Sequence, residues 1–179
     1  MKIGVSACLV GMNTKYDGKN NYNKAVIEYL KDKEYVTICP EVLGGLPTPR
    51  IPSEQIGEKV INKEGIDVSK QFYDGALKSL NYLKSQNVTT LVLKAKSPSC
   101  GYKKIYNGTF TKTLIDGNGV FTNLAIENGF TIFTEIDIEN QQLITLGGRF
   151  DLYEEELEKK HKSERIIIEF NGMWNMKEM

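Results

Sequence analysis

Cysteines are the residues of this sequence with the clearest capacity for chemistry. The chain has three, which are Cys8, Cys39 and Cys100. Each follows a short apolar run rich in β-branched residues, and such runs favour buried strands over helices. The runs are Ile3–Val5, Val36–Ile38 and Thr89–Leu93. Parallel strands of one sheet share a carboxyl edge, where open α/β sheets bind ligands. We therefore predict that the three thiols meet at this edge and hold a metal with one coordination position open.

The type of metal stays open at this point. Zinc takes three protein ligands and a water at catalytic sites, whereas iron–sulfur clusters take cysteine thiolates, usually four. Both kinds of site usually show a local C-x-x-C pair, which this sequence lacks, so the spacing does not name the metal. The alternative for any one cysteine is a small buried hydrophobic residue. That alternative loses weight because all three follow strands and have glycine or proline nearby.

Proton transfer at such a site falls to a group other than histidine. The one histidine, His161, lies in the charged stretch EEELEKKHKSE and is expected on the surface, which argues against Ser-His-Asp and Cys-His catalysis. Glu41, two residues after Cys39, is the best-placed acid or base. Near a metal and partly desolvated, it can exchange a proton near neutral pH. The alternative is an ordinary exposed loop carboxylate.

Four further polar residues are candidates, each with a purely structural alternative. Ser97 and Ser99, in SPSCG, can hydrogen-bond a substrate or a cluster sulfur, or only shape the turn. Arg50 can clamp an anionic or carbonyl group, or tie its loop down by a salt bridge. Asp17, in YDG, is more often a turn former than a catalyst. Dinucleotide and P-loop motifs do not occur, so NAD and nucleoside triphosphates are poor candidates.

The order of elements predicts an α/β fold. Helices are expected over residues 23–32, 71–85 and 120–128, with Ser69 as N-cap of the second, and a fourth strand over residues 130–133. After Cys39 a long loop is expected over residues 40–57, which holds four of the five prolines. Residues 59–62 and 66–68 suggest a small hairpin or edge pair around Gly65. Residues 101–119 suggest loops or a short hairpin. We predict a single three-layer αβα domain with a mainly parallel, Rossmann-like sheet.

The domain is expected over residues 1–135. Residues 136–179 are more charged and offer a helix near 152–160 and an apolar run at 166–170. They are predicted to be a C-terminal extension that packs on the domain or forms an oligomer contact.

The totals are those of one ordinary globular domain. The chain has 179 residues, 40% of them hydrophobic and 26% charged, which fits one domain with a sizeable core. Its 23 basic and 23 acidic residues give zero net charge, which disfavours a non-specific nucleic-acid or membrane-surface binder. No apolar stretch approaches the ~20 residues of a membrane span, and the N-terminus lacks the features of a signal peptide. We therefore expect a cytoplasmic protein without structural disulfides.

Several longer motifs together resemble the thiouracil desulfurase family. In chain order they are SACLVG with KYDG, CPEVLGGLPTPR, GIDVSKQFYDGA, LKAKSPSCG and YNGTF…GNGVFT. The resemblance runs from about Met1 to Glu135 and implies an α/β protein in which three cysteines hold a [4Fe-4S] cluster. The fourth iron would bind the sulfur of a thiolated uracil, and uracil and sulfide would be released without a redox cofactor. Purification in air can remove such a cluster.

The resemblance also assigns roles to matching positions. The implied cluster ligands are Cys8, Cys39 and Cys100. The implied catalytic residues are Glu41 and Ser97, with Ser99 as the second choice of serine. Apart from the resemblance, the candidates for substrate binding are Ser99, Arg50 and Asp17. The expected partner is a small thiolated pyrimidine and not a membrane, the zero net charge disfavours a nucleic acid, and the chain is a candidate homodimer.

Two other classes of function remain open. One is a metal-binding protein with a structural, sensing or sulfur-carrying role and no turnover, which a filled fourth coordination position would favour. The other is a metal-free enzyme with Cys39 or Cys100 as nucleophile, which would be colourless when purified without oxygen.

Overall fold

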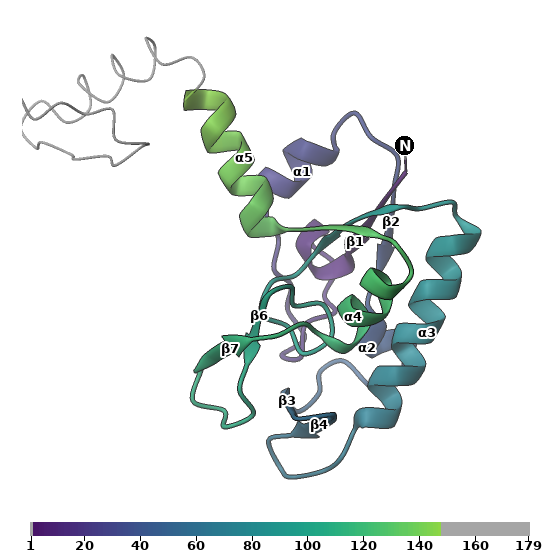
Figure 1. Ribbon diagram of the computed structural model, residues 1–179, viewed down its shortest axis with the longest axis vertical. Helices are drawn as coiled ribbons and strands as arrows, with labels where there is room; N and C mark the ends of the chain where they lie inside the picture. The colour runs from purple at the N-terminus through teal and green to yellow at the C-terminus, as the bar shows by residue number, and fades with distance from the viewer. Residues whose placement is uncertain (1, 148–179) are drawn as a thin grey trace, which may run out of the picture. The chain divides into compact units, whose positions relative to one another are not determined.

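The computed structural model describes residues 2–147, in which short strands alternate with helices (Figure 1). The strands are β1 (Ile3–Ser6), β2 (Tyr35–Ile38), β3 (Ser53–Ile56), β4 (Lys59–Asn62), β5 (Thr90–Leu93), β6 (Lys104–Tyr106), β7 (Leu114–Asp116) and β8 (Thr131–Thr134). The helices are the 3-10 helix η1 (Ala7–Val10), α1 (Lys24–Leu30), α2 (Pro40–Leu43), α3 (Ser69–Ser85), α4 (Val120–Glu127) and α5 (Glu135–Gly147). The predicted helix near 152–160, the apolar run at 166–170 and His161 lie outside the described residues.

Four parallel strands form the central sheet, in the order β2-β1-β5-β8. Because β1 pairs with β2 on one side and with β5 on the other, the strands that precede the three cysteines are neighbours. The predicted α/β fold with a parallel sheet is therefore confirmed. Numbered among themselves, the four strands run 2-1-3-4, which is the flavodoxin-like order and not that of dinucleotide-binding sheets. The Rossmann-like detail of the prediction is not confirmed.

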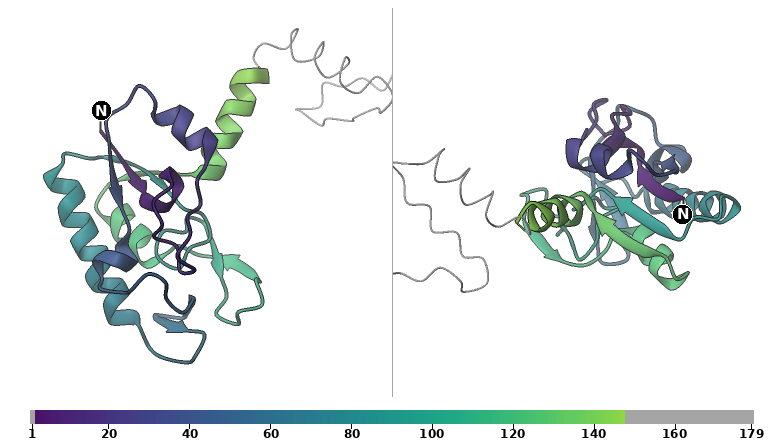
Figure 2. Two further views of the ribbon diagram at one scale, coloured as in Figure 1. Left: turned by 180° about the vertical axis from the view of Figure 1, so that it is seen from behind. Right: turned by 90° about the horizontal axis from the view of Figure 1, so that it is seen from above.

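Helices cover both faces of the sheet and complete the three layers. On one face, Phe72 of α3 and Phe121 of α4 are fully buried in a cluster that includes Leu91 of β5. On the other face, Val26 of α1 is fully buried in a cluster with Val5 of β1. Seen from above, α1 and α4 lie on opposite sides of the sheet (Figure 2). Fully buried apolar side chains of this size each stabilise the fold by about 1.5–3 kcal/mol.

Two antiparallel hairpins lie outside the central sheet. β3 pairs with β4 across Gly57, whose φ of +60° suits the first central residue of a tight hairpin turn. From the sequence we expected residues 53–56 to lie in a loop and residues 59–62 to pair with residues 66–68. That pairing exists only as an Ile61–Asp67 bridge with flanking hydrogen bonds. The second hairpin, β6–β7, confirms the short hairpin considered for residues 101–119.

Ser69 does not cap α3 as predicted. It is the first residue of the helix, and Val68 occupies the N-cap position. The Ser69 hydroxyl instead accepts a hydrogen bond from the Val60 amide at 2.9 Å. The side chain therefore ties the start of α3 to β4.

α2 packs against α3 through two glycines. A Cβ atom added to Gly44 would lie 1.9 Å from the Gln71 carbonyl oxygen, and one added to Gly75 would lie 1.9 Å from the Pro40 carbonyl oxygen. Both distances are far shorter than a real carbon–oxygen contact. The two backbones therefore meet at a distance that only glycine permits. This contact fixes the short helix that begins directly after Cys39.

We expect Gly75→Ala to destabilise the protein by about 1–3 kcal/mol, as overpacking does in a closely packed interior. In an isolated helix the same change would stabilise by about 1 kcal/mol, because alanine is the better helix former. Urea unfolding of wild type and variant measures the difference. A variant as stable as wild type, or more stable, would show that α2 moves aside without cost.

Among the described residues, no helix is both long and apolar enough to cross a bilayer. Residues Met1–Asn140 form one compact unit by their contacts. The division of the chain at residue 135 and the role of residues 136–179 stay predictions.

Candidate metal centre and active site

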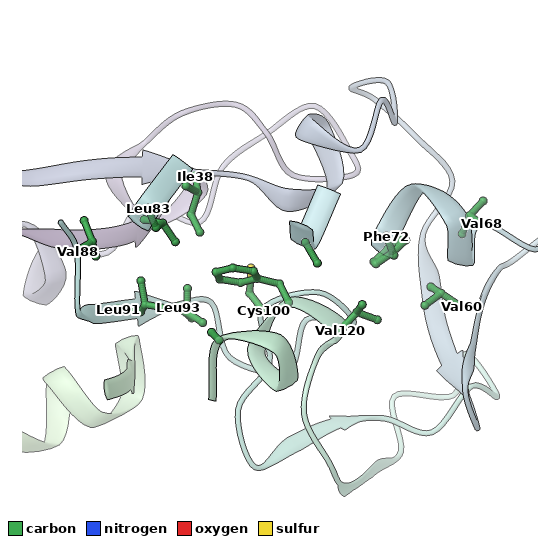
Figure 3. Packing of buried hydrophobic residues seen from close by; sticks show 13 residues of the cluster. Ile38, Val60, Val68, Phe72, Leu83, Val88, Leu91, Leu93, Cys100 and Val120 are labelled. Atoms are coloured by element: carbon green, nitrogen blue, oxygen red, sulfur yellow. The ribbon is translucent and has the colours of Figure 1, made fainter. Parts of the chain in front are cut away.

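The three cysteines follow the carboxyl ends of three adjacent strands. Cys8 lies in η1 directly after β1, Cys39 is the residue between β2 and α2, and Cys100 lies in the turn region that follows β5. Cys100 is buried in the apolar cluster on the α3 and α4 face, as Figure 3 shows, and the other two are half-buried. None of the three is in a disulfide. Parallel pairing therefore brings the three segments that carry the cysteines to the same edge of the sheet.

Burial and mutual repulsion keep the thiols protonated. Burial is the largest cause that raises the pKa of each of the three. The Cys39 charge raises the pKa of Cys8, and the charges of both raise the pKa of Cys100, which lies well above its usual range. Hydrogen bonds from Asn21 to Cys8 and from Ser6 to Cys100 act in the opposite direction. The thiols are thus close enough for the charge of one to raise the pKa of another. Ionising them together would require a compensating cation nearby.

We expect the metal-free protein to lose stability as the pH rises from 8 to 10. In the unfolded chain a thiol ionises near pH 8.5, roughly the ordinary cysteine value, whereas burial raises the pKa of the folded thiols. In this window the folded state therefore binds more protons than the unfolded state, and the free energy of unfolding falls with rising pH.

Thermal unfolding of wild type and Cys100→Ala at both pH values measures this effect. The melting temperature of the variant should fall less between pH 8 and 10 than that of wild type. Equal falls in the two proteins would mean that Cys100 does not contribute.

Glu41 lies in the first turn of α2 and is held by Arg50. The Arg50 Nε donates to Glu41 Oε2 at 2.7 Å, and the two side chains are only 6% and 16% exposed. Glu41 Oε1 accepts no hydrogen bond from the described residues. The Glu41 charge also raises the pKa of Cys39 and Cys100, so the carboxylate lies near both thiols. Glu41 is therefore a fixed, largely buried carboxylate and not the exposed loop residue of the alternative.

Arg50 is almost fully engaged with its own surroundings. Besides Glu41, its guanidinium donates to the carbonyl oxygen of Thr14 at 2.9 Å and to Thr48 Oγ1 and the Pro47 carbonyl at 3.1 and 3.3 Å. Its backbone amide donates to the Tyr16 carbonyl at 2.7 Å. These bonds tie the loop after α2 to the segment after Cys8. They match the salt-bridge alternative for Arg50, and they leave one N–H for any ligand.

Ser97 organises the turn that carries Cys100. Its Oγ accepts hydrogen bonds from the backbone amides of Ser99 and Cys100, both at 3.1 Å. The Gly101 amide closes the turn onto the Ser97 carbonyl at 2.8 Å. Because the Ser97 hydroxyl accepts in both side-chain bonds, its own hydrogen remains to donate. Ser97 thus shapes the turn and still offers a donor beside Cys100.

Asp17 stabilises the turn that the YDG motif predicts. Its carboxylate accepts from Lys15 Nζ at 2.8 Å and from the Lys19 amide at 3.1 Å. The hydrogen bond from Lys15 is the main reason that the pKa of Asp17 lies below its usual value. Within residues 2–147, no hydrogen bond or ion pair joins Asp17 to Glu41 or to a cysteine, so its substrate-binding role stays a prediction.

Lys94 and Glu135 form a charged pair beside Cys8 that the sequence predictions missed. Lys94 Nζ donates to Glu135 Oε1, and the Ala95 amide donates to Glu135 Oε2 at 2.7 Å. Both charges act on the pKa of Cys8, Lys94 lowering it and Glu135 raising it. Lys94 directly follows β5 and Glu135 directly follows β8, so the parallel pairing of these strands places both residues at the same edge of the sheet.

An open cavity of about 410 Å³ adjoins this pair. Its lining residues are Leu9, Asn21, Tyr22, Asn23, Lys94, Ala95, Lys96, Glu135, Ile136 and Glu139. Neither Glu41 nor Ser97 lines it. Two of its lining residues relate it to Cys8, because Leu9 is the next residue along the chain and the side chain of Asn21 lowers the pKa of Cys8.

Buried hydroxyl groups near the thiols lack partners. Within residues 2–147, these are the side-chain oxygens of Thr14, Ser99 and Thr122. The Thr14 carbonyl is 4.0 Å from Cys39 Sγ, and the Thr122 amide donates to the Ser99 carbonyl at 3.3 Å, next to Cys100. A buried hydroxyl without a partner costs about 1–3 kcal/mol. The hydroxyls thus belong to residues whose backbones lie next to the cysteine segments, and donors there fit a sulfur-rich cofactor, which would accept such hydrogen bonds.

The three cysteines are not grouped as the ligands of a single metal ion are. The described part of the chain contains no group of three or more histidine, cysteine, aspartate or glutamate side chains placed to hold a metal ion. The thiols interact through charge without forming a compact single-ion site.

Comparisons with known proteins agree with the motifs. The family model described as 2-thiouracil desulfurase matches residues 3–137, so the chain belongs to the 2-thiouracil desulfurase family. A curated relative, the uncharacterized protein YbbK of Bacillus subtilis (strain 168), is 36% identical over 76% of this chain and 97% of its own. A solved structure, the [4Fe-4S]-dependent thiouracil desulfidase TudS, is 38% identical and covers 80% of this chain and 97% of its own, with a TM-score of 0.73.

Proposed function

We propose that this protein is an iron–sulfur-dependent desulfurase that converts a thiolated uracil into uracil and sulfide. The observation that carries the proposal is the placement of three cysteines at the carboxyl ends of three adjacent parallel strands, with a buried carboxylate beside them. Family membership supports the reaction. The similar solved structure, whose title names a [4Fe-4S]-dependent thiouracil desulfidase, supports the cofactor and the substrate class.

In this proposal Cys8, Cys39 and Cys100 hold a [4Fe-4S] cluster. In such a cluster each cysteine would bind a different iron, so the lack of a single-ion site among the described residues is compatible with a cluster. When bound, the cluster would supply a soft Lewis-acidic iron for a thiocarbonyl sulfur. Since burial raises the pKa of all three thiols, loading the site releases their protons.

Glu41 is the proposed general base and acid of a hydrolytic, non-redox reaction. Thiouracil and water give uracil and hydrogen sulfide, so no electron leaves or enters. Arg50 fixes one Glu41 oxygen and leaves the other open, and that oxygen takes a proton from the attacking water and returns it to the departing sulfur. Arg50 acts here as a positioning residue that keeps the carboxylate in place.

Ser97 is proposed to donate its remaining hydrogen to the ring or to the water. Its two accepted hydrogen bonds hold the oxygen still, so the donor is oriented before substrate arrives. Ser99 is fully buried and its hydroxyl has no partner among the described residues, which suits a hydrogen bond to the cofactor or to a substrate in contact with it.

The remaining expectations stay predictions. They are a small thiolated pyrimidine as the partner, a cytoplasmic location and a homodimeric assembly.

The decisive experiment is purification without oxygen, followed by iron and sulfide analysis and incubation with 2-thiouracil and 4-thiouracil. We expect a brown protein with about four irons per chain that releases uracil and sulfide from at least one of them without an electron donor. A colourless protein with full activity would favour the metal-free cysteine nucleophile. A loaded protein without turnover on either base would favour a sensing or carrier role.

A further inference from the structure

Gln55 is the one side chain of β3 that reaches the segment carrying Cys100. Its Nε2 atom donates to the carbonyl oxygens of Pro98 at 2.8 Å and Asn118 at 2.9 Å. These partners are 43 and 63 residues away along the chain. Both hydrogens of the amide are therefore used to join two loops that meet at the cysteine.

The two loops depend on each other where Gln55 joins them. The Gly119 amide donates to the Gly101 carbonyl at 2.8 Å, and the Val120 amide donates to the Pro98 carbonyl at 2.9 Å. A Cβ atom on Gly119 would lie 2.2 Å from the Ser99 carbonyl oxygen. The Cys100 turn thus rests directly on the start of α4, with Gln55 fastened across the junction.

The neighbouring residue has a different task. Glu54, which is buried, accepts hydrogen bonds from the amides of Gly108 at 2.9 Å and Phe110 at 3.0 Å. It therefore anchors the loop between β6 and β7. Only Gln55 of this strand bonds on both sides of the cysteine turn.

We infer that Gln55 is a positioning residue for Cys100. By holding Pro98 and Asn118 at a fixed distance, it keeps the Cys100 turn closed and its thiol at one place at the sheet edge. These two hydrogen bonds form without a cofactor. Its consequence for a cluster rests on the proposed function, because it presupposes that Cys100 is a ligand.

Cysteine alkylation in the metal-free full-length chain tests the inference. Rates for Cys8, Cys39 and Cys100 are read separately by peptide mass spectrometry after timed exposure to iodoacetamide. Gln55→Leu removes both hydrogen bonds, and we expect Cys100 to react about tenfold faster, as loss of these local bonds would give. Cys8 and Cys39 should change less than about twofold. Gln55→Glu, which cannot donate to the two carbonyls, should act in the same direction.

Gln86→Leu is the matched control. Gln86 is the C-cap residue of α3, four residues before β5, and its side chain makes no hydrogen bond to the described residues. This variant should leave all three rates unchanged. An unchanged Cys100 rate in Gln55→Leu would overturn the inference. Equal acceleration of all three cysteines would also overturn it, because it would show general loosening of the fold.

Iron release from the reconstituted protein separates this inference from the proposed function. If wild type takes up a cluster, Gln55→Leu should lose iron faster on dilution with a chelator. If wild type takes up none, the proposed function fails, whereas the alkylation result still decides the role of Gln55.

Discussion

Replacing any one of the three cysteines by alanine is expected to remove the cluster and to lower turnover by more than about 100-fold. Cys8, Cys39 and Cys100 come from three different strands, so none can substitute for another. Loss of one cysteine would leave a second iron of the cluster without a protein ligand. Iron and sulfide content, visible absorbance and sulfide release after anaerobic purification measure the effect.

The pattern across the three variants is informative. Under the proposed function all three lose colour and activity together. Activity that survives in two variants and is lost only in Cys39→Ala or Cys100→Ala would indicate a cysteine nucleophile instead. Met12→Ala is a suitable control, because Met12 is an exposed sulfur-bearing side chain four residues from Cys8 and should retain wild-type iron content.

Glu41→Gln is expected to keep the cluster and to lower kcat by about 10²- to 10⁴-fold, which is the usual contribution of general acid–base catalysis. Glutamine has the size of glutamate and can still accept the hydrogen bond that Arg50 Nε makes at 2.7 Å. It cannot carry a proton between water and sulfide. Steady-state rates with the better of the two thiouracils, together with the iron content of the same samples, test this separation.

Glu58→Gln provides the matched control for this change. Glu58 is exposed in the turn between β3 and β4, so the same substitution there should leave both kcat and iron content unaltered. A Glu41→Gln protein with wild-type kcat would remove Glu41 from the chemistry. A protein that loses iron as well would show that Glu41 acts on the cluster site and not on proton transfer.

The sequence by itself determined the parallel sheet and the placement of the three cysteine-bearing segments at one of its edges. Short β-branched runs before Cys8, Cys39 and Cys100 identified three buried strands, and a helix between successive strands required them to be parallel. Parallel strands end at one edge, so residues directly after them must be neighbours. These inferences succeeded because they depend only on local pattern and on a general rule of connection.

Only the tertiary structure decided how the site is held. Arg50 was compatible with ligand binding or with loop anchoring, and the structure engages it with Glu41 and three further groups. The close approach of Gly44 and Gly75 to α3 and α2, and the double hydrogen bond of Gln55, are equally invisible in the sequence. Such contacts join residues that are tens of positions apart, and they leave no periodic signal, because their partners are backbone atoms that every residue possesses.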